Sequence, residues 1–221
     1  MFSVAIDGPS GAGKSSIARR AAERLGFIYV DTGALYRTVG LAMSRANTDL
    51  TSEKAVAELL DSIKVELVFK NGEQRVLLNG EDVSDAIRTP KASMMASKCS
   101  ALPAVRAFLL DLQRNMAKTN SIIMDGRDIG TVVLPDANVK IYLTASAKVR
   151  AKRRYDELIE KGHNVEFKDV LADMEKRDYD DMNRATAPLK QADDAVLLCT
   201  DDLNFEESIL AVLKIINGEQ N

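Results

Sequence analysis

The chain has 221 residues, a length that fits one compact core with a modest insertion and argues against two equal domains. Hydrophobic residues make up 46% and charged residues 29% of the sequence, which excludes a disordered or collagen-like chain. The formal net charge is −3, so the chain has no overall attraction for nucleic acid or anionic membranes. Any anion-binding site must therefore be local, and we expect neither nucleic acid nor a membrane as a partner.

The two cysteines, Cys99 and Cys199, form no CxxC pair. A disulfide framework and a zinc site therefore both lack support, and a reducing compartment fits best. The first residues, MFSVAID, lack the basic segment of a signal peptide. No apolar run reaches the roughly eighteen residues that a membrane-spanning helix needs. We expect a cytoplasmic protein.

Strands and helices alternate along most of the chain. Short apolar runs that end in an acidic residue and a turn predict strands, and runs with apolar residues at helical spacing predict helices. This alternation predicts a parallel sheet with helices on both faces. The predicted strands are 2–6, 27–30, 122–124, 139–143 and 195–199, and the predicted helices are 15–25, 34–45, 103–118, 147–160, 167–180 and 205–217.

One stretch, residues 62–88, breaks this alternation. Alternating apolar and polar residues at 64–69 and 75–79 are separated by the turn pair Asn71–Gly72, and Gly80 follows the second run. Short strands around such turns are typical of antiparallel hairpins. The stretch therefore predicts a small antiparallel insertion.

A glycine-rich segment joins the first predicted strand to the first predicted helix. Residues 8–15, GPSGAGKS, match the pattern G-x-x-x-x-G-K-[ST], which is specific in this strand-to-helix setting. Glycines let consecutive backbone N–H groups point at phosphate oxygens, Lys14 reaches the terminal phosphates, and the Ser15 hydroxyl can ligate Mg²⁺. The segment predicts a nucleoside triphosphate site but does not identify the acceptor.

Acidic residues follow two of the predicted strands. Asp125 comes after the apolar run 122–124, and Asp31 comes after the run 27–30. Ligands gather at the carboxyl edge of parallel sheets. Asp125 is therefore a candidate to support the Mg²⁺ shell through water, while Asp31 has a weaker claim to the same role.

Arginines recur near predicted helix starts and loops, as phosphoryl transfer between two anions requires. Arg150, Arg153 and Arg154 share one helical face because of their spacing. A solvated helix face explains the same run and stays an alternative. The other arginines in such positions are Arg37, Arg106, Arg127, Arg177 and Arg184.

Six sequence blocks, in this order and over nearly the whole chain, resemble the bacterial cytidylate kinase family. The blocks are VAIDGPSGAGKSS, VDTGALYR, NGEDVSDAIR, ASKCSALPAVR, MDGRDIGTVVLPDA and RDYDDMNRATAPL. The resemblance implies a three-layer α/β fold of the P-loop kinase type, with a central parallel sheet, a small antiparallel subdomain that binds the nucleoside monophosphate, and a helical lid. The implied single domain has its core at 1–61, 89–145 and 183–221, its insertion at 62–88, its lid at 146–164 and a following helix at 165–182.

The resemblance also implies transfer of the γ-phosphoryl group of ATP to CMP or dCMP, with Mg²⁺, by a monomer. The residues matching Ser97, Arg106 and Asp128 would face the cytosine. A carboxylate accepts from the exocyclic amine of cytosine but would meet the O4 acceptor of uracil. No general base is needed, since the acceptor phosphate is already ionised. Another P-loop small-molecule kinase, or an ATP-binding switch without catalysis, stays open as an alternative.

The implied site residues fall into four groups, which overlap. The catalytic set is Lys14, Arg127, Arg150 and Arg154; the ATP-binding set is Gly8, Pro9, Ser10, Gly11, Ala12, Gly13, Lys14, Ser15 and Ser16; the CMP-binding set is Thr32, Tyr36, Arg37, Ser97, Arg106, Arg127, Asp128, Arg177, Asp181 and Arg184; and the metal set is Ser15 and Asp125.

Overall fold

The fold is described from a computed structural model, which covers residues 1–70 and 73–218. The predicted turn at Asn71–Gly72 lies outside the described residues. The chain divides into two compact units, one made of residues 1–29 and 120–221 and the other of residues 30–119.

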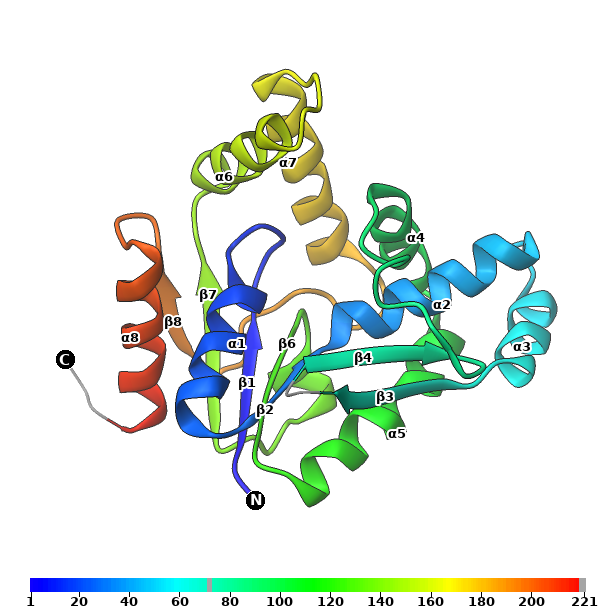
Figure 1. The fold of residues 1–221 in the computed structure, drawn as a ribbon, viewed down its shortest axis with the longest axis horizontal. Helices are drawn as coiled ribbons and strands as arrows, with labels where there is room; N and C mark the ends of the chain where they lie inside the picture. The colour runs from blue at the N-terminus through cyan, green and yellow to red at the C-terminus, as the bar shows by residue number, and fades with distance from the viewer. Residues whose placement is uncertain (71–72, 219–221) are drawn as a thin grey trace. The chain divides into compact units, whose positions relative to one another are not determined.

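A parallel sheet forms the centre of the first unit (Figure 1). Its order is β2-β6-β1-β7-β8, and β1 pairs in parallel with β6 and β7. Asp7 at the end of β1 lies beside Gly126 of β6 and Tyr142 of β7, so the loops after β1 and β6 leave the same edge of the sheet. The strands are β1 (Ser3–Asp7), β2 (Ile28–Asp31), β6 (Ile122–Gly126), β7 (Val139–Thr144) and β8 (Val196–Cys199).

Two helices flank this sheet and complete the core of the first unit. The helices are α1 (Lys14–Leu25) and α8 (Phe205–Ile216). Ile17 of α1 and Ile209 of α8 are buried in one apolar cluster with Ile141 of β7. The Asn204 side chain begins α8 by accepting from the Glu207 N–H in a capping box, which satisfies an otherwise unpaired donor.

Two further helices, α6 (Ala147–Glu160) and α7 (Phe167–Asn183), are joined by a short loop and pack against each other in the same unit (Figure 1). Ala151, Val170 and Met174 make a small apolar cluster between them. The helix pair therefore carries a core of its own. The range predicted as the lid, 146–164, contains α6 and the turn after it.

The second unit consists of helices around a small antiparallel sheet. Its strands are β3 (Val65–Lys70), β4 (Glu73–Leu78) and β5 (Glu81–Asp82), in the order β3-β4-β5. This confirms the antiparallel character predicted for residues 62–88, and the compact unit extends beyond that range on both sides. Its helices are α2 (Thr32–Ala46), α3 (Glu53–Ser62), α4 (Pro90–Ser100) and α5 (Pro103–Thr119).

Helices α2 and α4 approach closely at Gly40. A Cβ atom at Gly40 would lie 3.0 Å from the Cβ of Met95 and 3.2 Å from the backbone nitrogen of Ala96. Only glycine lets the two backbones come this near without a shift. The contact sets the position of α4, which carries Ser97.

The predicted parallel sheet with flanking helices is confirmed, and the strand and helix ends differ from prediction by only a few residues. Helices α3 and α4 and a π-helical turn at Ile129–Val133 were not predicted. Cys99 and Cys199 are both free thiols, as expected. No helix in the described part of the chain is both long and apolar enough to cross a membrane.

Candidate functional site

The glycine-rich segment forms a curled loop between β1 and α1. Gly11 and Gly13 have φ angles of +76° and +87°, in the left-handed region that glycine adopts readily. A Cβ at Gly8 would lie 1.9 Å from the Leu143 carbonyl oxygen of β7, so no side chain fits there. The N-terminus of α1 opens onto this loop, and the arrangement suits an anion.

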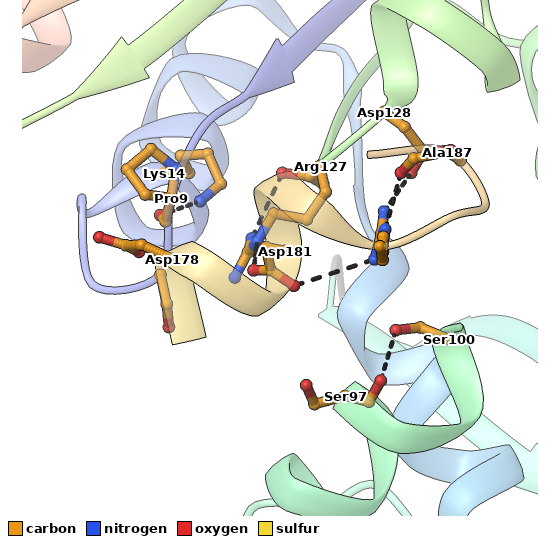
Figure 2. Close-up of polar contacts among 12 residues, drawn as sticks. Pro9, Lys14, Ser97, Ser100, Arg127, Asp128, Asp178, Asp181 and Ala187 are labelled. Atoms are coloured by element: carbon orange, nitrogen blue, oxygen red, sulfur yellow. Dashed lines mark hydrogen bonds and ion pairs between the residues drawn. The ribbon is translucent and has the colours of Figure 1, made fainter. Parts of the chain in front are cut away.

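Lys14, the first residue of α1, is buried, and its Nζ donates to the Pro9 carbonyl at 2.7 Å (Figure 2). Burial lowers the pKa of Lys14, and the positive charge of Arg127 adds to the effect, while Asp125 and Asp7 oppose it. The ammonium group thus lies across the phosphate loop and donates to a backbone oxygen of that loop. Phosphate oxygens are better partners for such a cation.

Asp125, buried in β6, holds the position next to Ser15 that the sequence predicted. Its carboxylate accepts from the Ser15 hydroxyl at 2.8 Å and from the Tyr29 hydroxyl at 2.9 Å. A hydroxyl with a carboxylate behind it is an oxygen donor set that suits Mg²⁺, which keeps several waters and takes phosphate oxygens as ligands. Among the described residues, no group of three or more His, Cys, Asp or Glu side chains is placed so that it could hold a metal ion, so most ligands of a bound Mg²⁺ would come from substrate and water.

Asp31, the weaker metal candidate, has a structural task in the second unit. Its carboxylate accepts from the Ala34 N–H at 2.9 Å and thereby caps α2. Its other oxygen forms an ion pair with Arg37 at 2.8 Å. These contacts explain the acidic residue at the end of β2 without a metal.

Asp7, which the sequence analysis did not select, fixes the loop after β6. Its two carboxylate oxygens accept from the backbone N–H groups of Ile129 and Gly130, each at 2.7 Å. These bonds pin the π-helical turn that follows Asp128. Burial raises the pKa of Asp7 to about 6, against the lowering effect of the two N–H groups. The only sequence signal was an acidic residue directly before the phosphate loop.

Four charged side chains of the first unit form a network of ion pairs close to the end of β6 (Figure 2). Arg127 donates to Asp181 of α7 at 2.8 Å. Arg184, which follows α7, lies 3.7 Å from Asp128 and 3.9 Å from Asp181. Arg184 also donates to the Ala187 carbonyl at 2.7 Å. Four of the residues predicted to contact CMP are thus brought together. Arg177 is exposed on the same helix, α7.

Near the start of α5, the second unit brings together three of the predicted acceptor residues, Tyr36, Ser97 and Arg106. Arg106 is buried, donates to the Ser100 carbonyl at 3.3 Å, and places its guanidinium 5.7 Å from the centre of the Tyr36 ring. Ser97 lies one turn before Ser100, and its carbonyl accepts from the Ser100 hydroxyl at 3.0 Å (Figure 2). Arg106 is therefore not a surface arginine. Thr32 is buried in the first turn of α2.

The three arginines of α6 share a face but have different partners. Arg150 is buried and forms an ion pair with Asp178 of α7. Arg153 donates to the Thr200 carbonyl at 2.8 Å, and Arg154 pairs with Glu157 at 2.7 Å. The partner of Arg154 is a half-exposed neighbour on its own helix. Asp178 and Tyr29 were not predicted as site residues. Asp178 lies in the block RDYDDMNRATAPL, in which nothing distinguishes it from the neighbouring acidic residues, and Tyr29 lies outside the six blocks.

A curled phosphate loop between the first strand of a parallel sheet and a helix defines a P-loop protein of the α/β class, which binds a nucleoside triphosphate. A sequence model of the family described as cytidylate kinase matches residues 4–218. The chain belongs to the cytidylate kinase family.

Individual relatives agree with this assignment. The cytidylate kinase of Geobacter sulfurreducens is 50% identical over 217 residues, which cover 98% of this chain and 93% of the relative. That of Syntrophotalea carbinolica is 46% identical over 98% of this chain and 92% of the relative. Among solved structures, an uncharacterized protein from Eubacterium ventriosum has a TM-score of 0.52 at 14% identity, over 98% of this chain and 99% of that one, and this likeness concerns the fold alone.

Proposed function

We propose that this protein transfers the γ-phosphoryl group of ATP to CMP, and by the same contacts to dCMP, giving CDP or dCDP and ADP. The observation that carries the proposal is a complete phosphate loop with a buried Lys14 in a chain that matches the cytidylate kinase family from residue 4 to residue 218. The fold alone would support many small-molecule kinases. The family match narrows the acceptor to a cytidine monophosphate.

The donor triphosphate would lie in the loop formed by residues 8–16. Backbone N–H groups of the loop bind the phosphates, and the start of α1 adds favourable potential. Lys14 would exchange the Pro9 carbonyl, 2.7 Å away, for phosphate oxygens. Arg127 and Arg154 would offset the charge that moves during transfer, with Arg150 placed behind the loop.

Magnesium is the metal that this donor site fits. Ser15 would be its protein ligand, and Asp125, which already accepts from the Ser15 hydroxyl, would hold a metal-bound water. When bound, the ion offsets phosphate charge during transfer. The residues named here bind and orient it.

The acceptor base would be read by Asp128, Arg106 and Ser97. Asp128 is buried, and its carboxylate would accept from the N4 amine of cytosine. The O4 of uracil is itself an acceptor, so UMP would leave the carboxylate without a donor in a buried setting, which is costly. The remaining contacts to ribose and phosphate would come from Thr32, Tyr36, Arg37, Arg127, Arg177, Asp181 and Arg184.

The reaction needs alignment rather than proton transfer. An ionised oxygen of the CMP phosphate attacks the γ-phosphorus, a new P–O bond forms, and the bond to the β-phosphate oxygen of ATP breaks. No histidine or cysteine is required, and Cys99 is buried with its pKa raised to about 12. That the protein is a cytoplasmic monomer stays a prediction from the sequence.

Acceptor profiling with ATP and Mg²⁺ tests the proposal. Steady-state rates are compared for CMP, dCMP, UMP and AMP, in the wild type and in Asp128→Asn, with Asp136→Asn as a control for a surface carboxylate. We expect kcat/KM for CMP to exceed that for UMP by about a hundredfold or more, and Asp128→Asn to narrow that ratio at least about tenfold. Equal rates with CMP and UMP in the wild type would refute the role of Asp128, and no turnover of CMP would refute the function.

A further inference from the structure

Arg150 uses nearly all of its hydrogen-bond donors within the protein. Its Nε donates to the Ala145 carbonyl at 2.7 Å, and its Nη1 donates to the Ser10 carbonyl at 2.9 Å. Nη1 and Nη2 both donate to the Asp178 carboxylate. A guanidinium has five N–H bonds, and these contacts engage four of them. Little donor capacity is left for a phosphate group.

The contact with Ser10 determines how the tip of the phosphate loop is oriented. The described residues contain no cis peptide bond, and in a planar trans peptide the C=O and the following N–H point in opposite directions. Because the Ser10 carbonyl is turned toward Arg150, the Gly11 N–H is turned away from it. This directs the Gly11 N–H to the opposite side of that peptide, away from α6.

The loop tip also packs directly on the two helices behind it. A Cβ at Gly11 would lie 3.0 Å from the Cε of Met174 in α7 and 3.4 Å from the Cβ of Arg150 in α6. The Arg150 and Asp178 side chains are only 5% and 14% exposed. Breaking such a pair is costly, because a lone charge left behind at this depth would be strongly destabilising.

We propose that Asp178 is a positioning residue of the donor site, which acts through Arg150 to fix the Ser10–Gly11 peptide with its N–H ready for a phosphate oxygen. The proposal rests on the proposed function in one respect, that ATP binds in the phosphate loop. In this proposal Arg150 supports the loop, whereas the sequence analysis predicted that Arg150 is catalytic and contacts the phosphates. The catalytic role predicted for Lys14, Arg127 and Arg154 is unchanged. Preorganisation of this kind increases affinity by removing the ordering cost from the binding step.

The test is binding of a non-hydrolysable ATP analogue with Mg²⁺, without acceptor, measured by calorimetry on the full chain. Asp178→Asn is compared with Asp173→Asn, which changes an exposed carboxylate of the same helix. We expect Asp178→Asn to weaken binding about tenfold or more and Asp173→Asn to change it by less than about twofold. At saturating ATP, kcat should fall by less than about threefold and KM for CMP should stay constant, because only the donor loop has lost its support.

A second variant covers the case in which a lone Arg150 prevents folding. Arg150→Met combined with Asp178→Leu removes both charges and leaves an apolar contact, which proteins tolerate. It should fold and show the same weakened binding of the analogue, since the Ser10 carbonyl is no longer held. Binding like the wild type in this double variant would overturn the proposal.

Two other outcomes are decisive. If Asp178→Asn lowers kcat while binding is unchanged, Arg150 acts on the transferred group and the positioning role is wrong. If the wild type converts CMP normally and Asp178→Asn binds the analogue equally well, the positioning role alone is overturned. A wild type that does not bind the analogue at all would overturn both this inference and the proposed function.

Discussion

Lys14 is a buried cation whose hydrogen-bond acceptor is a neutral backbone carbonyl. Its Nζ is bonded to a backbone carbonyl, and desolvation lowers the pKa of the ammonium group. A buried cation of this kind contributes little to folding, because its desolvation offsets its attractions. The charge is therefore kept for binding and catalysis.

The substitution Lys14→Met tests this separation of roles. We expect kcat to fall by about a hundredfold or more, because the terminal phosphates lose their cation in the transition state. The free energy of unfolding should change by less than about 1 kcal/mol, because an apolar side chain of similar length replaces the ammonium. Turnover kinetics and urea unfolding measure the two quantities, with Lys148→Met, an exposed lysine of α6, as the control. A loss of stability without a loss of turnover would contradict the account.

Asp7 makes stability depend on pH in a direction opposite to that of most carboxylates. Its pKa is raised from 3.8 to about 6 by burial, so the folded state binds the proton more tightly than the unfolded state. Stability from this group is fully present below about pH 4 and is lost as pH rises toward 6. Above that range its contribution no longer changes.

The variant Asp7→Asn isolates this effect. As pH rises from 4 to 7, the free energy of unfolding of the wild type should fall by about 3 kcal/mol relative to that of the variant, because the pKa of Asp7 rises from 3.8 to about 6 on folding. Urea unfolding of both proteins over this range gives the difference directly. A difference that stays flat with pH would show that Asp7 titrates normally. Since Asn can accept only one of the two N–H bonds of the turn, KM for CMP should also rise.

The packing of α2 on α4 determines where the acceptor-binding side chains of α4 lie. Gly40 leaves no room for a Cβ atom against the Met95 backbone, whose carbonyl carbon would be 3.1 Å away. Helix α4 carries Ser97 and ends next to the Ser100 carbonyl that Arg106 contacts. A shift of α4 by a few tenths of an ångström should therefore disturb the acceptor contacts and leave the phosphate loop intact.

Gly40→Ala is the smallest change that imposes such a shift. We expect KM for CMP to rise several-fold, KM for ATP to stay within about twofold, and stability to fall by about 1 kcal/mol, since the clash outweighs the better helix propensity of alanine. The control is Ser44→Ala on the same helix. Equal changes in both KM values would mean that the substitution acts through general loss of structure and not through α4.

The sequence predicted those elements best whose periodicity and loop chemistry agree. Short-range patterns predicted the phosphate loop, the strands on either side of it, and a position for Asp125 beside that loop. In the structure β1 and β6 lie where they were predicted, and Asp125 accepts from the Ser15 hydroxyl. Helix α4 was missed although Thr89 caps it and Pro90 occupies its first turn, because its mixture of Ser, Met and Lys shows weak periodicity. That signal was present and could have been used.

Other features depend on contacts between distant segments and could not be predicted from one sequence. Asp7 meets Ile129 across 122 positions, and Arg150 meets Asp178 across 28. Nothing in the local sequence of either carboxylate identifies its partner. The spacing of Arg150, Arg153 and Arg154 predicted that they share one face of α6. It could not predict their separate partners, because burial and contacts with distant segments determine which partner each arginine has.

For the whole molecule, we propose that ATP held by the loop after β1 gives its terminal phosphoryl group to CMP. The most direct measurement follows ³²P from [γ-³²P]ATP in the presence of Mg²⁺ and CMP, with separation of the products. We expect the label to appear in CDP, its appearance to require CMP, and Lys14→Met nearly to abolish it. Label that remains in ATP, or that is released as inorganic phosphate at the same rate with and without CMP, would contradict the proposal.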